Sequence, residues 1–247
     1  MTSPDKLITR TGGQLLVDAL KVHGVDMAFG VPGESYLSVL DAFYESREQI
    51  KFVICRQEGG AANMADAYGK MTGRPGICFV TRGPGATNAS IGLHTAFQDS
   101  TPLILFIGQI DTEYTERESF QEIDYRRMYG QMAKWVAQID RADRVPEMVS
   151  HAFHLAVSGR PGPVVLALPE DMQVATAAVP DTARYQRVAA HAGTSDMNKV
   201  RAMLAAAERP CREKFRAEHA LRTHRVHVKY RACTCSRSHC TCAGRGC

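Results

Sequence analysis

Short apolar runs recur along the first 170 residues, and stretches with amphipathic spacing separate them. Each run is short enough to be a buried strand, and the runs cover 26–29, 51–55, 76–81, 102–108, 135–137 and 162–169. The run at 102–108 has no polar side chain, which is typical of a strand covered on both faces of a parallel sheet.

Helix signals fill the intervals between these runs. Thr11 and Gln14 match a capping box, and the apolar stripe after them ends at Gly24. Further helices are expected after the turn at 30–34, from Glu58 to Gly69 or Gly73, from 83–88 through Phe97, from about Glu122 to Gly130, and from Asp143. The sequence therefore predicts an α/β fold, a doubly wound and mostly parallel six-stranded sheet with helices on both faces.

The domain organisation follows from where this alternation ends. We expect one α/β domain over residues 1–171, followed by an Ala/Pro-rich linker over 172–194 that is loop-like to residue 192. A short helix then begins a partial second domain over 195–210. The remaining residues, 211–247, form an irregular tail in which no periodic pattern survives.

Charge and cysteine content set the tail apart from the rest of the chain. The net charge of +4 is concentrated there, because 211–247 holds 9 Lys and Arg against 2 Glu. Most of the eight cysteines also lie in the tail. Cys55 and Cys78 fall in strand runs instead, where we expect them to be buried as free thiols.

Three interpretations of the tail compete. A zinc site is disfavoured because the Cys-x-Cys pairs at 233–235 and 240–242 are closer than the usual spacing of about two to four residues. Nucleic-acid binding would suit the charge, but no aromatic platform accompanies it. Translation in a shifted reading frame after Pro210 is favoured, because composition and charge change at that residue, and such a tail is expected to be disordered.

The sequence also bears on the cellular compartment. It contains no run of about 18 apolar residues that would cross a membrane, and residues 1–6 lack the apolar core of a signal peptide. We therefore expect a cytoplasmic protein with no membrane partner.

Glu58 is the first candidate for chemistry. It lies where the strand at 51–55 ends and a helix begins, and the carboxyl edge of a parallel sheet is where ligands bind. An acid in the first turn of a helix often only complements the helix dipole. Here Gly59 and Gly60 leave room for a ligand to approach the backbone, which favours a binding role.

A glycine-rich loop, 83–88, also falls between a strand and a helix, as a dinucleotide fingerprint would. Two features disfavour a pyrophosphate site and hence a nicotinamide cofactor. Asn88 occupies the place of the third small residue, and Pro84 removes one of the amides that would hold the phosphate. The loop is better interpreted as a backbone surface that lets a flat ring approach.

Four motifs in this order carry a family resemblance, and they are Gly30-Val31-Pro32-Gly33-Glu34, Gln57-Glu58-Gly59-Gly60-Ala61-Ala62, Gly83-Pro84-Gly85-Ala86-Thr87-Asn88 and Phe120-Gln121-Glu122. With them the chain resembles the N-terminal, pyrimidine-binding domain of thiamine-diphosphate-dependent enzymes of the acetolactate synthase type. The resemblance covers about residues 7–175 and weakens to the start of a middle domain at 195–210.

The resemblance implies a task for Glu58. In such enzymes this glutamate hydrogen-bonds N1′ of the aminopyrimidine and favours the imino tautomer, which takes the proton from C2 of the thiazolium. The resulting ylide attacks the carbonyl of a 2-keto acid. A carboxyl that shares a proton with a ring nitrogen is expected to have a raised pKa, which a water-poor cleft provides.

The same resemblance implies roles for five further residues. Pro32 packs on the pyrimidine, Pro84 and Asn88 line its pocket, and Phe120 and Gln121 face the reacting centre, often from the partner subunit. Each has a plainer alternative. The prolines can simply shape turns, Asn88 can complete a helical turn, Phe120 can belong to the core and Gln121 can be solvated.

The chain departs from the acetolactate synthase pattern at Val31, Glu34 and Arg82, so decarboxylases, carboligases and acyl transferases of the family all stay open. The family binds Mg²⁺ and the diphosphate in a C-terminal domain marked by Gly-Asp-Gly, which does not occur here. We expect no metal ligands in this chain, and nothing in the sequence decides whether FAD binds.

The expected function is the N-terminal domain of a truncated acetolactate-synthase-like enzyme, holding only the pyrimidine half of thiamine diphosphate and inactive alone. A homodimer, or a partner carrying the diphosphate domain, would complete it. The alternatives are a half-enzyme completed by a separate chain, or a non-catalytic protein that binds nucleic acid or metal through its tail.

Overall fold

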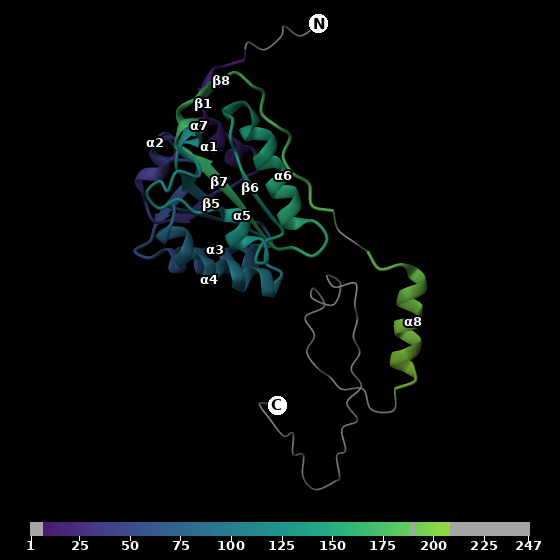
Figure 1. Cartoon of the computed structure of the whole chain (residues 1–247). Coiled ribbons are helices and arrows are strands. Elements are labelled where there is room, and N and C mark those ends of the chain that lie inside the picture. The colour runs from purple at the N-terminus through teal and green to yellow at the C-terminus, as the bar shows by residue number, and fades with distance from the viewer. Residues whose placement is uncertain (1–6, 189–190, 208–247) are drawn as a thin grey trace, which may run out of the picture. The chain divides into compact units, whose positions relative to one another are not determined.

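The structure is a computed structural model that describes residues 7–188 and 191–207 (Figure 1). The chain divides into two compact units, one over residues 1–189 and one that begins at residue 190. Of the second unit the structure describes mainly helix α8, Thr194–Ala205, in agreement with the helix expected near residue 196. The tail predicted at 211–247 lies outside the described residues.

The core of the first unit is a six-stranded sheet in the order β3-β2-β4-β5-β7-β6, and every pair of neighbours is parallel. Its strands are β2 (Met27–Gly30), β3 (Lys51–Ile54), β4 (Gly76–Val80), β5 (Leu103–Gln109), β6 (Trp135–Gln138) and β7 (Pro163–Pro169). The predicted α/β fold and its six strands are confirmed. Every residue of the central strands β5 and β7 is buried, as the continuous apolar run at 102–108 predicted.

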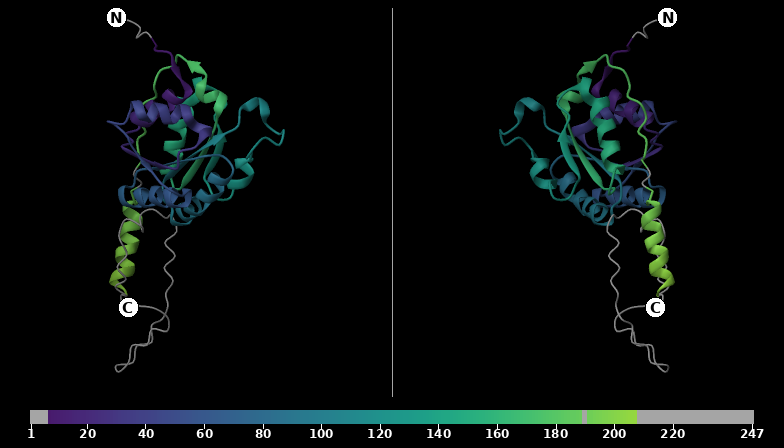
Figure 2. Two further views of the ribbon diagram at one scale, coloured as in Figure 1. Left: turned by 90° about the vertical axis from the view of Figure 1, so that its left-hand side faces the viewer. Right: turned by 90° about the vertical axis from the view of Figure 1, so that its right-hand side faces the viewer.

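Helices cover both faces of this sheet (Figures 1 and 2). One face packs against α1 (Gly12–Val22), α2 (Leu37–Glu45) and α6 (Val145–Val157). The other packs against α3 (Glu58–Thr72), α4 (Pro84–Asp99) and α5 (Tyr125–Tyr129). Successive residues of β4 alternate between the two, since Ile77 and Phe79 join the first core and Cys78 and Val80 the second.

Local signals account for several helix ends. Thr11 and Gln14 form the expected capping box, with Gln14 N donating to Thr11 Oγ1 over 3.2 Å and Thr11 N to Gln14 Oε1 over 3.1 Å. Gly73, with φ +70°, ends α3 in the left-handed conformation that glycine adopts without strain. Short 3₁₀ helices lie in the connections, among them η1 (Glu34–Tyr36), η2 (Thr112–Tyr114) and η3 (Ala142–Arg144).

The helix expected from Glu122 begins only at Tyr125. The side chain of Asp124 caps it by accepting from the backbone N–H groups of Arg126 and Arg127. The carboxylate of Glu122 is engaged elsewhere, because it accepts from backbone amides within the preceding loop. The acid that suggested a helix start therefore stabilises the loop before it.

The loop-like interpretation of residues 172–192 is wrong at its start. Helix α7 (Glu170–Val174) continues to residue 174, and β8 (Thr176–Ala177) pairs antiparallel with β1 (Arg10–Thr11). This segment is ordered because Met172 and Gln173 are buried, and Gln173 Nε2 donates to the carbonyls of Ser35 and Leu168. Residues 178–188 have neither helix nor strand. Within the described residues, no helix has the length and apolar character needed to cross a membrane.

Candidate functional site

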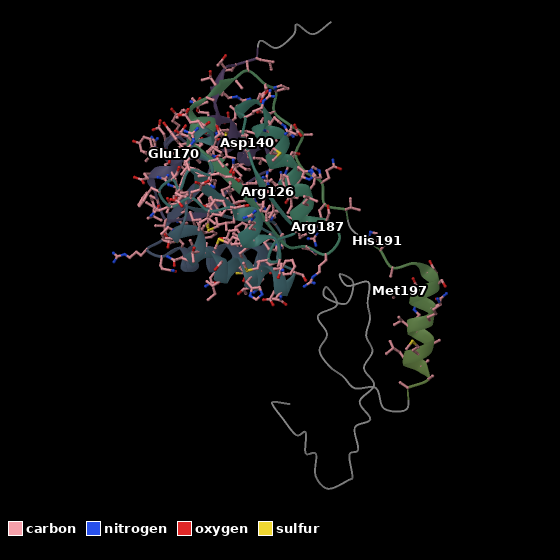
Figure 3. All side chains as sticks on the ribbon, in the orientation of Figure 1. Arg126, Asp140, Glu170, Arg187, His191 and Met197 are labelled. Carbon is pink, nitrogen blue, oxygen red and sulfur yellow. The ribbon has the colours of Figure 1, made fainter. Side chains whose placement is uncertain are left out.

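The sheet brings the predicted motifs to one edge. In a parallel sheet all carboxyl ends lie together, so the segments that follow β2, β3, β4, β5 and β7 meet there. These segments carry Pro32, Glu58, Pro84, Gln121 and Glu170 respectively. Figure 3 labels Glu170, at the start of α7, among the side chains of this unit.

Glu58 is the first residue of α3, and its side chain turns to the neighbouring helix. The orphan amide of Gly60 is already satisfied by Gln57, whose Oε1 lies 2.9 Å away. The partly buried carboxylate of Glu58 instead accepts from Nδ2 of Asn88, with 2.9 Å between nitrogen and Oε2. A hydrogen bond between a carboxylate and a carboxamide thus joins the N-terminal parts of α3 and α4. Complementing the helix dipole does not require this placement.

Gly85 is buried between this carboxylate and Thr81. A Cβ atom on Gly85 would lie 3.5 Å from Glu58 Oε1 and 2.8 Å from Thr81 Cγ2. Any side chain at this position would therefore enter the region that the carboxylate faces. That a flat ring approaches this loop stays a prediction.

The turn before α4 has an unusual backbone. Gly83 has φ +58°, and its N–H donates to the hydroxyl of Tyr125 over 3.1 Å. Pro84 is exposed and opens α4 at its first position, where proline suits the helix. Pro84 therefore shapes this turn, and a cofactor-facing role stays a prediction.

Pro32 is exposed in the turn between β2 and η1. This turn packs on the end of β4, since a Cβ on Gly33 would lie 2.7 Å from Thr81 Cβ. The hydroxyls of Ser35 and Thr81 also lie 2.8 Å apart. The structure thus joins the Pro32 turn to the residue that precedes Arg82 and the glycine loop.

Gln121 lies against the glycine loop, whereas Phe120 faces solvent. A Cβ on Gly83 would lie 2.7 Å from Gln121 Cβ, and Gln121 itself has φ +64°. Phe120 is 70% exposed, so the alternative that it belongs to the core is wrong. Residues between 116 and 124, Gln121 and Glu122 among them, line an open hollow of about 480 Å³ that does not include Glu58.

Arg82 is the residue of this edge whose role the sequence did not reveal. It is only 8% exposed, and its guanidinium pairs with Glu34, 3.2 Å away, and with Glu170. Arg82 and Glu34 are two of the three departures from the family pattern, and they contact each other. A charged residue at the end of an apolar strand run was the available signal, because a buried arginine requires acidic partners.

The groups beneath the site are strongly desolvated. Burial is the main cause of the raised pKa of the Cys78 thiol, and charges at Cys55 and Glu58 act in the same direction. Burial likewise raises the pKa of Tyr36, and it raises the pKa of Tyr125 to about 12. Cys55 and Cys78 are free and buried as predicted. The raised pKa of Cys78 makes its thiol unreactive.

Residues that could bind a metal are not clustered in this part of the chain. Across 7–188 and 191–207, no group of three or more His, Cys, Asp or Glu side chains is arranged to hold a metal ion. The zinc interpretation concerned tail cysteines outside the described residues.

Comparison with known proteins shows the family. Residues 10–128 match the family described as thiamine pyrophosphate enzyme, N-terminal TPP binding domain. The chain is 42% identical to acetolactate synthase of Arthrospira platensis over 164 residues. This aligned region is 66% of this chain and 28% of that protein. It is 38% identical over 165 residues to the mitochondrial acetolactate synthase catalytic subunit of Saccharomyces cerevisiae, 67% of this chain and 24% of the relative.

A third relative extends further along the chain. The large subunit of acetolactate synthase isozyme 2 of Escherichia coli is 35% identical over 202 residues, which are 81% of this chain and 36% of that subunit. The chain thus spans about a quarter to a third of the length of these relatives. The predicted resemblance is confirmed, and the matched region of the chain is an acetolactate-synthase-like N-terminal TPP-binding domain.

Proposed function

We propose that Glu58 binds the pyrimidine half of thiamine diphosphate in an acetolactate-synthase-like enzyme that acts on 2-keto acids by decarboxylation or carboligation. The observation that carries this proposal is the Glu58–Asn88 pair near the N-termini of α3 and α4, beside Gly85. Membership of the TPP-binding family supports the choice of cofactor.

The residues present fit an aminopyrimidine. A carboxylate can share a proton with a ring nitrogen. The residue beside Glu58 Oε1 is Gly85, which adds no side chain there. Asn88 donates to Oε2 and so orients the carboxylate. Thiamine diphosphate, when bound, supplies the electron sink for bond cleavage next to a carbonyl.

Each residue of the chain then has a definite task. Glu58 holds a proton between its carboxylate and the ring nitrogen, Asn88 keeps that carboxylate in place, and the Pro32 and Pro84 turns border the ring. Gln121 lies against the Gly83 turn, which supports a position beside the reacting centre. Phe120 extends outward and is available to cover that centre from the solvent side.

A second domain or subunit completes the site in this proposal, by binding the diphosphate through Mg²⁺. The relatives' greater length supports it, since they extend well beyond the region matched here. Exposed apolar side chains next to Glu58, on β3, α3 and α4, support a partner surface, which a homodimer or a diphosphate-domain chain would cover. FAD is no part of the proposal, and the cytoplasmic location stays a prediction.

The test is the change Glu58→Gln in the full chain, with thiamine diphosphate and Mg²⁺ titrated in a calorimeter. We expect binding to weaken about tenfold or more, because a hydrogen bond to a charged group is lost. Glu147→Gln is the matched control, because Glu147 is also a first-turn acid, of α6. A weakened cofactor affinity in both variants, or in neither, would contradict the proposal.

A further inference from the structure

Arg82 connects three segments that are distant in sequence. Its side chain donates to Oε1 of Glu34 over 3.2 Å, to the carboxylate of Glu170, and from Nε to the carbonyl oxygen of Phe120 over 3.1 Å. Glu34 follows β2, Phe120 follows β5 and Glu170 follows β7. One buried guanidinium at the end of β4 thus binds the segments that leave three other strands.

The segment at 115–122 forms hydrogen bonds mainly within itself. The carboxylate of Glu122 accepts from the amides of Glu116 and Ser119, over 2.8 and 3.3 Å. Its ends are held separately, since Gln109 Nε2 donates to the Ile123 carbonyl and Thr112 donates to Asp171. Between these ends, Arg82 donates a hydrogen bond to the carbonyl oxygen of Phe120 and so connects the segment to the sheet edge.

The residues that follow Arg82 and Phe120 in the chain, Gly83 and Gln121, pack closely against each other. Gly83 and Gln121 approach each other so closely that a Cβ on Gly83 would lie 2.7 Å from Gln121 Cβ. Both residues have positive φ, at +58° and +64°. Such an approach persists only while the surroundings hold the two backbones together.

The chemistry of arginine suits this role better than that of lysine. A guanidinium has five N–H donors in a planar fork and can serve two carboxylates and a carbonyl at once. With three acceptors engaged and 8% of its surface exposed, Arg82 is not free to bind the carboxylate of a substrate. We therefore expect Arg82 to act indirectly, by holding the segment at 115–122 in place through Phe120.

We propose that Arg82 is a positioning residue, which holds the segment 115–122 on the Gly83-Pro84 turn and so places Phe120 and Gln121 at the cofactor edge. The segment's position follows from contacts within this chain. Only the purpose of that position, next to a bound pyrimidine, rests on the proposed function.

Hydrogen exchange of the full chain, followed by mass spectrometry without any ligand, tests this inference. In Arg82→Met we expect the amides of 115–122 to exchange about tenfold faster or more, because local opening no longer breaks a charge-assisted hydrogen bond. Peptides from β5 and β7 should keep their protection. Arg160→Met is the matched control, because Arg160 also donates to backbone carbonyls, those of Phe97 and Gln98, at 3.1 Å.

Two further variants keep the test decisive. Arg82→Lys retains the charge for Glu34 and Glu170 but lacks the Nε–H for Phe120, so its loop should still exchange fast, even where Arg82→Met fails to fold. Glu34→Gln should leave the loop protected, since Arg82 keeps Glu170 and Phe120. Loop exchange within about twofold of wild type in a folded Arg82→Lys protein would overturn the inference. Failure of the Glu58 binding test would leave this result untouched.

Discussion

His23 shows how much one buried side chain can depend on its charge state. It follows α1, is 1% exposed, and stacks on Phe153 with ring centroids 4.4 Å apart. Its Nδ1 accepts from the N–H of Tyr185 over 3.2 Å, and its Nε2 has no hydrogen-bond partner among the described residues. The ring is therefore neutral in the fold, because a proton on Nδ1 would face the Tyr185 donor.

Stability should fall in mild acid because of this histidine. Burial, followed by the charges of His154 and Arg184, lowers the pKa of His23 from 6.5 to about 4. Between these values the unfolded chain binds a proton that the folded chain does not, so the free energy of unfolding decreases as the pH falls from 6.5 towards 4. Urea titrations at pH 7 and pH 5 (~100-fold in proton activity) measure the decrease, and His23→Gln should reduce it. Equal pH dependence in both proteins would contradict this origin.

The predictability of single residues depended on how local their signals are. Glu58 was predicted at a strand-to-helix junction, because both the strand and the helix start are visible in adjacent residues. Its partner Asn88 lies 30 residues away, and Glu34 lies 48 residues from Arg82. Pairs of this kind depend on the order of strands in the sheet, which hydrophobic patterns do not specify, so two paired residues were interpreted as unrelated departures.

At the scale of elements, glycines set how closely α3 approaches the sheet. A Cβ on Gly76 of β4 would lie 1.9 Å from the carbonyl oxygen of Ala65 in α3. That atom belongs to the backbone, so the clash cannot be relieved by a side-chain rotation. Gly60, on the exposed side of the same helix, has no neighbour within 4 Å of such a Cβ.

These two glycines should respond to alanine in opposite directions. Gly76→Ala should destabilise the fold by about 1–3 kcal/mol or more, because α3 must move off β4. Gly60→Ala should stabilise it by about 0.4–1 kcal/mol, because alanine restricts the unfolded chain and favours helix. Urea unfolding followed by the fluorescence of Trp135, the one tryptophan of the chain, measures both. Two changes of the same sign would show that the backbone contact at Ala65 does not limit the packing.

Element boundaries were predicted well where pattern and capping agree, as at Thr11 and at the ends of β5. They failed where a side chain served a distant partner. Glu122 stabilises a loop instead of starting a helix, and Gln173 orders a segment of linker-like composition by donating to Ser35 and Leu168. Composition alone does not reveal such contacts, because they form only after the sheet has brought the segments together.

At the scale of the molecule, α3 and α4 form a helix layer whose outer side exposes large apolar side chains to solvent. They pack closely through small residues, since a Cβ on Gly92 would lie 2.6 Å from Ala62 Cβ. On and beside them, Ile54, Met64 and Ile91 are 70%, 41% and 61% exposed. Ile91 lies beside the Glu58–Asn88 pair, since a Cβ on Gly59 would lie 3.1 Å from Ile91 Cγ2 and 3.2 Å from the carbonyl oxygen of Asn88. A subunit that covers Ile91 would therefore also remove water from the proposed cofactor site.

Self-association should therefore depend on this surface and not on exposed apolar residues in general. Ile91→Asp should weaken dimer formation about tenfold or more, because it places a charge in a desolvated contact. Leu37→Asp, on α2 and 63% exposed, should leave it unchanged. Sedimentation equilibrium over a range of concentrations measures both against the chain mass of 27.1 kDa. A wild-type chain that stays monomeric, or equal weakening by both substitutions, would exclude the homodimer and leave a separate diphosphate-domain chain as the partner to be sought.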